Sequence, residues 1–404
     1  MKYIHLVPWS PRKTYGGYET IIRTTAVAQA ETGDEIFIVG RVMGSKRCIK
    51  TYLIDNVNYI EIEDPQRRRP GTLDIGIIGY FLLFWEIFYS LILLTPIVIS
   101  LIKKKKIDAV IFYGIHLCMM APIVRVFHTK AILGLEVIQK NAYQSKLSVL
   151  YWFRKLKYAM FSGIFTYTHY FYMPDGQVID NLTLIKNYTK SPLAYIPWGI
   201  DIKKTLKILN SRNIEYKLPI KKYKKIIICP RRLVEEKGVM YLLEAIPLVL
   251  KHSPNVLFIY AGDGIMKNKL KQKAIEMKIN SNVLFTGFLK YEDTLMAIKK
   301  SDIVVVPSSG EESFGMVFLE SYLLKKPIVS TWFGGIPNVI RDKKTGVLVK
   351  PRDSKALAIA ILSLLNNPKK SEEMTAQGYS LLLKKFNLAT TINKINKFTN
   401  SIKI

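Results

Sequence analysis

The sequence predicts an α/β protein whose two domains are each built on a parallel sheet. Its 404 residues, of which 49% are hydrophobic, are enough for two domains of about 200 residues with a core each. Apolar segments of strand length recur along the chain and end in Gly, Pro or a small polar residue, after which a helix-like segment begins. That alternation is typical of parallel sheets covered by helices. We place the domains at residues 1–197 and 198–370, followed by a tail at 371–404.

The first domain begins with the strand-like segment KYIHLVPW, and a helix carrying Ile21, Ile22 and Val27 follows. The loop between them contains Gly16 and Gly17, and a residue without a side chain lets the backbone approach a phosphate or sugar closely. A plain turn explains the same dipeptide. Two later segments of this domain have the same strand-ending pattern, KKKKIDAVIFYGIH and TKAILGLEVIQKN, and the segment LAYIPWGID leads into the second domain.

A polar stretch that runs from Lys203 to Lys225 carries the chain across into the second domain. Its strand-like segments are, in order, IIICPRRL, LFIYAGDG, NVLFTGFL, SDIVVVPSS, KPIVSTWFGG and TGVLVKP. The tail after Pro368 has no strand pattern. Its apolar residues are spaced as in helices, at Leu381, Leu382, Phe386 and Ile392.

Two carboxylates flank a predicted helix start in the segment EESFGMVFLE. Glu312 lies on the loop that leaves an apolar strand, and Glu320 lies about two helical turns further on. The segment from Ser313 to Gly315 opens the helix, and the free N–H groups of a helix N-terminus attract anions. The pattern favours a site for a sugar phosphate, although two solvated glutamates at an ordinary turn would give the same spacing.

Two basic residues, Arg232 and Lys237, follow the first strand of the second domain. Arginine offers a planar fork to phosphate oxygens and lysine a compact point charge, so the pair suits a diphosphate. On a chain with 60 Lys and Arg residues, two such residues can also be ordinary surface charge.

These motifs, in this order, resemble the donor site of retaining GT-B glycosyltransferases of family 4, the glycosyl transferases group 1. The signature of that family is two glutamates separated by seven residues, as Glu312 and Glu320 are. The resemblance covers the C-terminal half closely and the N-terminal half more loosely. It implies two Rossmann-like domains that face each other across a cleft, and a C-terminal helix that crosses back to the first domain.

The resemblance also implies roles for individual residues. Glu312, Arg232 and Lys237 are the expected catalytic residues, with the glutamate beside the donor sugar and the cations on the departing diphosphate. Glu320 is expected to hold the ribose hydroxyls. Backbone N–H groups at the helix start add a positive field. The other expected donor-binding residues are Gly16, Gly17, Phe288, Leu289, Phe314, Gly315 and Met316, and Glu136 and His116 are expected on the acceptor side.

The sequence departs from the family pattern at two informative positions. Many relatives carry a histidine near the donor sugar where this chain has Leu133, and His116 or His128 could substitute for it from a neighbouring loop. An isolated histidine in an apolar setting is more often structural. The usual glycine before the Arg-Leu pair is Arg231, which either adds a phosphate contact or faces solvent.

The segment from Leu73 to Ile102 is almost wholly apolar and is followed by four lysines, Lys103 to Lys106, on a chain of net charge +29. About 20 apolar residues suffice to span a bilayer, but Glu86 within the segment would cost about 2.5 kcal/mol or more at its centre. Pro96 would break a straight helix. We expect one or two helices that dip into an anionic membrane surface, and a buried helix pair or a true span stays open.

No cofactor or metal ion is expected. The chain has no Asp-x-Asp pair, its five histidines do not cluster, and its three cysteines form neither a zinc spacing nor a disulfide framework. No secretory signal is evident, so we expect a peripheral or monotopic protein at the cytoplasmic face of the cell membrane.

Three hypotheses about function follow. The leading one is a glycosyltransferase that uses a nucleotide sugar to extend a lipid-linked or other cell-envelope glycan. The second is a non-catalytic subunit that binds a nucleotide sugar or acts as a scaffold, which the missing histidine favours. The third is a nucleic-acid binder, suggested by the pI near 9.8, but the sequence has no recognisable motif for reading nucleic acid, and we expect no such partner.

Overall fold

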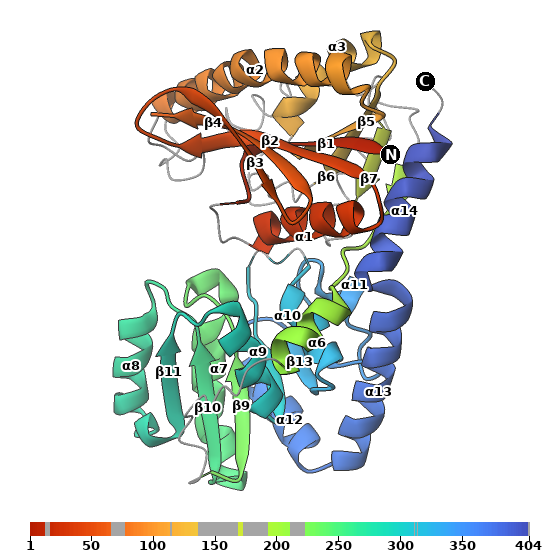
Figure 1. Cartoon of the computed structure of the whole chain (residues 1–404). Helices are drawn as coiled ribbons and strands as arrows, with labels where there is room; N and C mark the ends of the chain where they lie inside the picture. The colour runs from red at the N-terminus through yellow and green to blue at the C-terminus, as the bar shows by residue number, and fades with distance from the viewer. Residues whose placement is uncertain are drawn as a thin grey trace, which may run out of the picture. The chain divides into compact units, whose positions relative to one another are not determined.

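The computed structural model describes two compact units (Figure 1). The first contains the described residues up to Trp198 together with those from Leu388 onward, and the second contains Gly199–Asn387. Side chains are described for most of these residues. The described residues are 1–12, 17–65, 77–113, 115–135, 169–172, 193–210, 223–310, 312 and 314–402.

The first unit is built on a sheet of eight strands in the order β3-β4-β2-β1-β5-β6-β7-β8. All neighbouring strands are parallel except β3 and β4. Its elements are β1 (Lys2–Trp9), α1 (Gly17–Glu31), β2 (Glu35–Met43), β3 (Cys48–Ile54), β4 (Val57–Asp64), α2 (Ile77–Lys105), β5 (Ala109–Tyr113), η1 (Ile115–Met120), α3 (Ala121–Val126), β6 (Lys130–Leu135), β7 (His169–Tyr172), β8 (Leu193–Tyr195) and α14 (Leu388–Ser401).

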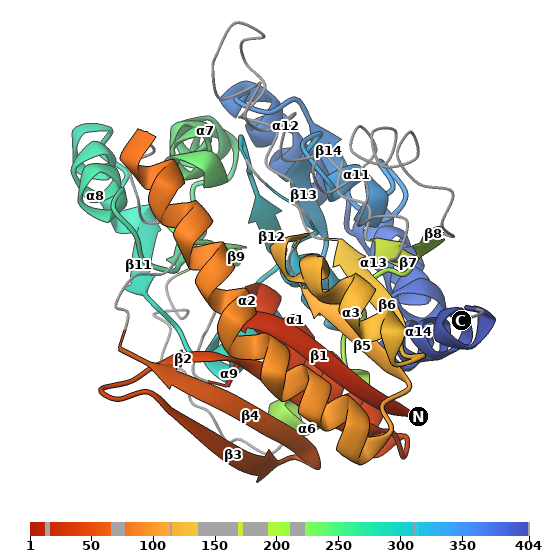
Figure 2. The same cartoon turned by 90° about the horizontal axis from the view of Figure 1, so that it is seen from above.

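Helices cover both faces of this sheet, which explains why its central strands are apolar without alternation. Every residue of β5 is buried, and so are the residues of β1 from Tyr3 to Val7. Figure 1 shows α1 on one face and α2 on the other, and both helices contact β2. The view from above in Figure 2 shows the later turns of α2 passing over β1, which α2 also contacts.

From Ile77 onward, the apolar segment and the first lysines after it form the single long helix α2, which continues through Pro96. The prediction that Pro96 would break a straight helix is therefore wrong. Leu94, Val98 and Ile102 are buried at intervals of four residues, so one face of α2 packs into the unit. Ile92, on the other face, is 55% exposed. None of the helices in the described part of the chain is both long enough and apolar enough to cross a membrane.

The C-terminal helix α14 packs within the first unit. Ile392 lies in a small apolar cluster with Ala28 of α1, and Thr391 donates a hydrogen bond of 2.8 Å to the carbonyl of Pro197. We expected the returning tail to begin at residue 371. Instead the chain rejoins the first unit at Leu388, because the preceding helix packs against the second unit, where Gly378 lies against the ring of Tyr322.

The second unit is built on six parallel strands in the order β11-β10-β9-β12-β13-β14. The first strand, β9, lies in the middle, and the strand order reverses between β9 and β12. Its elements are α6 (Ile202–Asn210), β9 (Lys225–Cys229), η4 (Glu235–Lys237), α7 (Val239–His252), β10 (Val256–Ala261), α8 (Lys267–Glu276), η5 (Asn280–Asn282), β11 (Val283–Gly287), α9 (Tyr291–Lys300), β12 (Ile303–Val306), α10 (Met316–Leu323), β13 (Ile328–Thr331), α11 (Ile336–Val339), β14 (Val347–Val349), α12 (Ser354–Leu365) and α13 (Pro368–Lys385).

Candidate functional site

The candidate site lies in the second unit, beyond the carboxyl ends of β9 and β12. In open parallel sheets, ligands bind outside the carboxyl ends of the strands, at the point where the strand order reverses. The loop after β9 carries Arg231 and Lys237, and the loop after β12 carries Ser308 and Glu312. Residues more than 70 positions apart in the chain therefore meet at this edge of the sheet.

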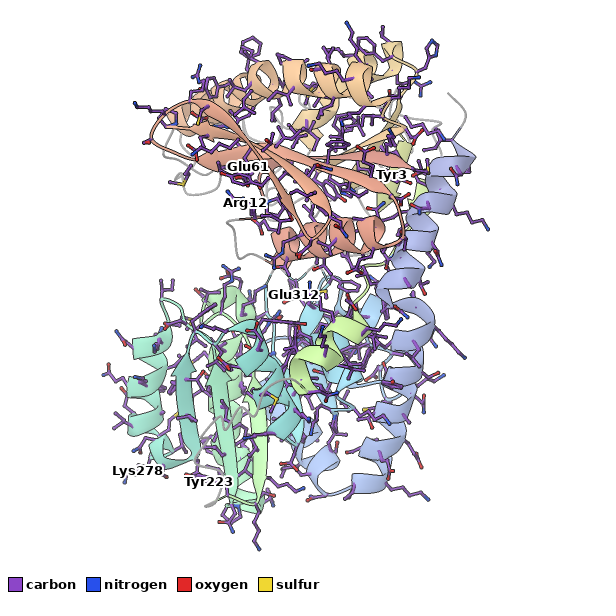
Figure 3. The ribbon with its side chains drawn as sticks, in the orientation of Figure 1. Tyr3, Arg12, Glu61, Tyr223, Lys278 and Glu312 are labelled. Carbon is purple, nitrogen blue, oxygen red and sulfur yellow. The ribbon has the colours of Figure 1, made fainter. Side chains whose placement is uncertain are left out.

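Glu312 is the centre of this cluster (Figure 3). Its side chain is only 6% exposed, and its Oε2 atom forms an ion pair with Arg231 Nη2. The same oxygen accepts hydrogen bonds from Lys237 Nζ at 3.3 Å and from Ser308 Oγ at 3.0 Å. A buried carboxylate with two cations and a hydroxyl around it is stabilised in its charged form, because each partner favours the charge.

The backbone of Glu312 is held by the loop after β13. The N–H of Gly335 donates a hydrogen bond of 2.9 Å to the Glu312 carbonyl. A Cβ atom on Gly334 would lie only 2.2 Å from the same carbonyl, and the φ angle of Gly334 is +54°. Both observations require a glycine here, since a side chain would collide with the loop that carries Glu312.

The loops after β9 and β12 are also joined to each other by their backbones. The N–H groups of Ser309 and Gly310 donate hydrogen bonds of 3.1 and 2.8 Å to the carbonyl of Glu236. Gly238 has a φ angle of +67°, and a Cβ atom there would lie 1.8 Å from the carbonyl oxygen of Pro307. This close approach brings Lys237 to Glu312.

The two adjacent arginines lie in different environments. Arg231 is directed to Glu312, and its side chain is 11% exposed, whereas Arg232 is exposed. The chain bends at Arg231, whose N–H donates a hydrogen bond of 3.1 Å to the carbonyl of Cys229, and only Arg231 of the pair faces the buried carboxylate. Burial, with a smaller contribution from the nearby charge of Arg232, lowers the pKa of Arg231 to about 10. The sequence analysis placed Arg232 among the catalytic residues and did not decide whether Arg231 contacts a phosphate or faces solvent.

Ser308 is a member of the cluster that the sequence prediction did not include. It lies two residues after the end of β12, and its hydroxyl accepts a hydrogen bond of 3.1 Å from Arg231 Nη2 while it donates one to Glu312. A small polar residue close to the end of a buried parallel strand is the signal that could have identified it, because the strand end places it at the ligand-binding edge.

The helix start predicted at Ser313 to Gly315 is found one residue later. Gly315 is the N-cap residue of α10, with a φ angle of +75°, and Met316 is its first helical residue. Phe314 is buried and makes an edge-to-face contact with Phe386, with the ring centroids 5.7 Å apart. It therefore anchors the loop that carries Glu312 to the second unit.

Glu320 lies on α10 and is 7% exposed. Burial raises the pKa of its carboxyl from the usual 4.5 to about 7, and the charge of Arg231 acts in the opposite direction. A carboxyl with a pKa near 7 changes charge in the neutral pH range and can accept or donate a hydrogen bond there.

Phe288 and Leu289 follow β11 at the same edge of the sheet. Phe288 is 75% exposed and Leu289 is partly buried. Gly287, just before them, has a φ angle of +74°, which turns the chain away from the strand. An exposed aromatic ring at this edge offers a flat apolar surface to a ligand.

The expected site residues of the first unit are only partly described. Gly16 and Glu136 lie outside the described residues, Gly17 is the first residue of α1, and the side chain of His116 is not described. Leu133 is buried within β6. His128 precedes β6 and so lies at the amino end of the strands, whereas ligands of parallel sheets bind at the carboxyl end.

A comparison with protein families matches residues 210–381, most of the second unit, to "Glycosyl transferases group 1". The chain is 30% identical to the alpha-D-kanosaminyltransferase of Streptomyces kanamyceticus over 41% of this chain and 42% of that protein. It is 29% identical to the alpha-monoglucosyldiacylglycerol synthase of Streptococcus pneumoniae over 52% of this chain and 50% of that protein. The matches to these two curated relatives thus span half or less of the relatives' length.

Solved structures match the fold over both units. Sucrose-phosphate synthase from Thermosynechococcus elongatus has a TM-score of 0.74 at 17% identity, and the match covers 99% of this chain and 98% of that one. Anabaena HepE in complex with UDP has a TM-score of 0.69 at 16% identity, with complete coverage of both chains. Residues 210–381, less than half of the chain, thus match the glycosyl transferases group 1, and the chain has the two-domain GT-B fold.

Proposed function

We propose that the protein is a retaining, metal-independent glycosyltransferase that moves a sugar from a nucleotide-diphosphate sugar to a lipid-linked or other cell-envelope glycan. The observation that carries this proposal is the convergence of Arg231, Lys237 and Ser308 on Glu312 at the strand-reversal edge of the second unit. The names of the relatives, which include a kanosaminyltransferase and a glycolipid synthase, support the same class of reaction.

The proposed reaction places opposite charges on two parts of the donor. As the sugar leaves, positive charge develops at its anomeric carbon and negative charge on the departing diphosphate. Lys237 and Arg232 stabilise the diphosphate, together with the N–H groups at the start of α10. Glu312 lies beside the sugar, where its negative charge stabilises the anomeric carbon. The departing phosphate accepts the proton of the acceptor hydroxyl on the same face, which gives retention.

The acceptor is proposed to lie at the cytoplasmic face of the cell membrane because of the outer surface of α2. An apolar groove of about 690 Å³ runs along this helix beside Ile92, Pro96 and Ile99, and Lys103 and Lys104 lie at one end of it. Apolar side chains next to lysines fit a surface of anionic lipid, since acyl chains and headgroups match the two chemistries.

Nucleotide binding is tested by thermal unfolding of the full chain with UDP, GDP and ADP sugars, because a ligand that binds only the folded state stabilises it. We expect stabilisation by one nucleotide class, and its loss in the double variant Arg232→Ala, Lys237→Ala. Lys251→Ala is the matched control, since this exposed residue lies in the last turn of α7 at the opposite end of the strands. Stabilisation that persists in the double variant would contradict the proposed donor site.

Membrane binding is tested by flotation with phosphatidylcholine vesicles that do or do not contain phosphatidylglycerol. Each lysine near an anionic surface contributes about 1 kcal/mol, so we expect Lys103→Glu with Lys104→Glu to weaken binding by about 30-fold or more. The control reverses two other adjacent lysines, Lys369 and Lys370 of α13. Equal binding by both double variants would exclude α2 as the membrane-binding surface.

A second function, nucleotide-sugar binding without turnover, is favoured by Leu133, which takes the place of the expected histidine. A glycosyltransferase releases the nucleoside diphosphate from its donor, whereas a protein that only binds the donor does not. If one sugar nucleotide stabilises the protein but is not cleaved in the presence of membrane extract, the non-catalytic function replaces the first proposal.

A further inference from the structure

Arg231 has an environment that is unusual for a residue whose only task is to bind a ligand. Its side chain is 11% exposed, and its Nη2 atom contacts both Glu312 Oε2 and Ser308 Oγ. A buried guanidinium costs free energy unless it is paired, and Arg231 is paired with a residue of the site itself. Its positive charge is therefore committed to Glu312 before any ligand arrives.

The contacts around Glu312 distinguish its two oxygen atoms. Arg231, Lys237 and Ser308 all contact Oε2. Ser308 Oγ also contacts Arg231, so Arg231, Ser308 and Glu312 form a closed triangle. Within the described part of the chain, no hydrogen bond to Oε1 is found. This oxygen faces the start of α10, because a Cβ atom added to Gly315 would lie 3.4 Å from it.

Lys237 alone cannot fix the carboxylate in this way. A lysine ammonium is a point charge on a flexible stem, whereas a guanidinium is planar and holds a carboxylate in a defined plane. In the proposed reaction Lys237 also binds the diphosphate, which draws its charge away from Glu312. Arg231 and Ser308 then remain to hold Oε2.

We propose that Arg231 is a positioning residue for the transfer reaction. Through the triangle with Ser308 it holds Oε2 of Glu312, so that Oε1 is presented to the donor sugar at the start of α10. This inference rests on the proposed function and assigns Arg231 a task different from that of Arg232 and Lys237, which bind the diphosphate.

The test measures nucleotide release and nucleotide affinity separately in the full chain. The donor is the sugar nucleotide that stabilises the protein in the thermal panel, and the affinity probe is the matching free nucleoside diphosphate. For Arg231→Met, which removes the charge but retains an apolar side chain, we expect kcat to fall about 100-fold, as a misplaced catalytic group does. The Kd of the diphosphate should change by less than about threefold, because the phosphate-binding cations remain.

Two further variants separate positioning from a purely structural role. Arg231→Lys retains the charge and should recover about tenfold of the lost kcat, with the same Kd. Ser308→Ala leaves the buried ion pair intact, and it should lower kcat by about fivefold, the value of one ordinary hydrogen bond. It serves as the second test if Arg231→Met does not fold. In a Glu312→Gln background, Arg231→Met should lower kcat little further, because the two residues act as one unit.

Three results with these variants would overturn the positioning role of Arg231. If Arg231→Met weakens diphosphate binding as much as Lys237→Ala does, Arg231 is a direct phosphate ligand and the positioning role is overturned. The positioning role is also overturned if Arg231→Met leaves kcat unchanged. It is overturned as well if the double variant of Arg231 and Glu312 loses kcat by the product of the two single losses. If the wild type releases no nucleotide from any UDP, GDP or ADP sugar, the proposed function itself fails. If the wild type is active and the Arg231→Met variant has the same kcat, only the positioning role of Arg231 fails.

Discussion

Glu320 gives the sharpest quantitative prediction, because its buried carboxyl links stability to pH. Burial raises its pKa from 4.5 to about 7. One pKa unit corresponds to about 1.4 kcal/mol, so the ionised carboxyl lowers the free energy of unfolding by about 3 kcal/mol. The folded chain binds this proton more tightly than the unfolded chain does. Stability is therefore unaffected by the carboxyl below pH 4.5, falls between pH 4.5 and 7, and stays reduced above pH 7.

The substitution Glu320→Gln removes the ionisation and leaves a side chain of the same size. We expect the variant and the wild type to be similar in stability near pH 4.5, and the variant to be more stable by about 3 kcal/mol at pH 8. The measurement is urea unfolding of both proteins at several pH values from 5 to 8. Glu373→Gln, at an exposed position of α13, is the control for a general effect of removing one negative charge.

A difference between Glu320→Gln and the wild type that stays constant from pH 5 to 8 would refute the reasoning. It would mean that Glu320 ionises at its ordinary pKa and that the charge of Arg231 compensates fully for burial. A difference that also appears in Glu373→Gln would assign the effect to net charge, which is already +29.

Two further predictions concern packing. Gly238→Ala should unfold at a lower temperature and lose nucleotide binding, because its Cβ would collide with the Pro307 carbonyl. Gly33 has a comparable φ angle of +94° but open space around it, so Gly33→Ala should lower the unfolding temperature less. Leu94→Ala should lower the free energy of unfolding by about 3 kcal/mol, since Leu94 is fully buried on α2, and Ile92→Ala on the exposed face should change it by less than about 0.5 kcal/mol. Urea unfolding checks the second pair, and equal effects of its two members would contradict the burial pattern of α2.

Much of the fold was predictable from local patterns in the sequence. Short, mainly apolar segments between Gly, Pro and polar residues correspond to the six strands of the second unit, from β9 to β14. The placement of Glu312 and Lys237 in the segments that follow β12 and β9 was also clear, because both residues come after an apolar strand pattern has ended. Strand formation and chain reversal depend on neighbouring residues, so a local pattern is enough to indicate them.

Other features depended on packing and were not predictable from local patterns. Pro96 was expected to break a helix, but α2 continues through it because Leu94, Val98 and Ile102 are buried against the unit on both sides of the proline. The chain returns to the first unit only at Leu388 because α13 packs against the second unit. Propensity is a weak preference, and burial of an apolar face outweighs it.

The sequence by itself determined the two parallel-sheet domains, and it predicts an anion-binding type of site in the second of them, because periodicity, glycines and strand ends are local properties. Only the tertiary structure decided that Arg231 faces Glu312, that Arg232 is exposed, and that Ser308 completes the cluster. Arg231 is more than 70 positions away from Ser308 and Glu312 in the chain, and the pairing of β9 with β12 brings it to them. Which side chain points into a site is set by that pairing and by the backbone direction at each strand end, and neither is written in the local sequence.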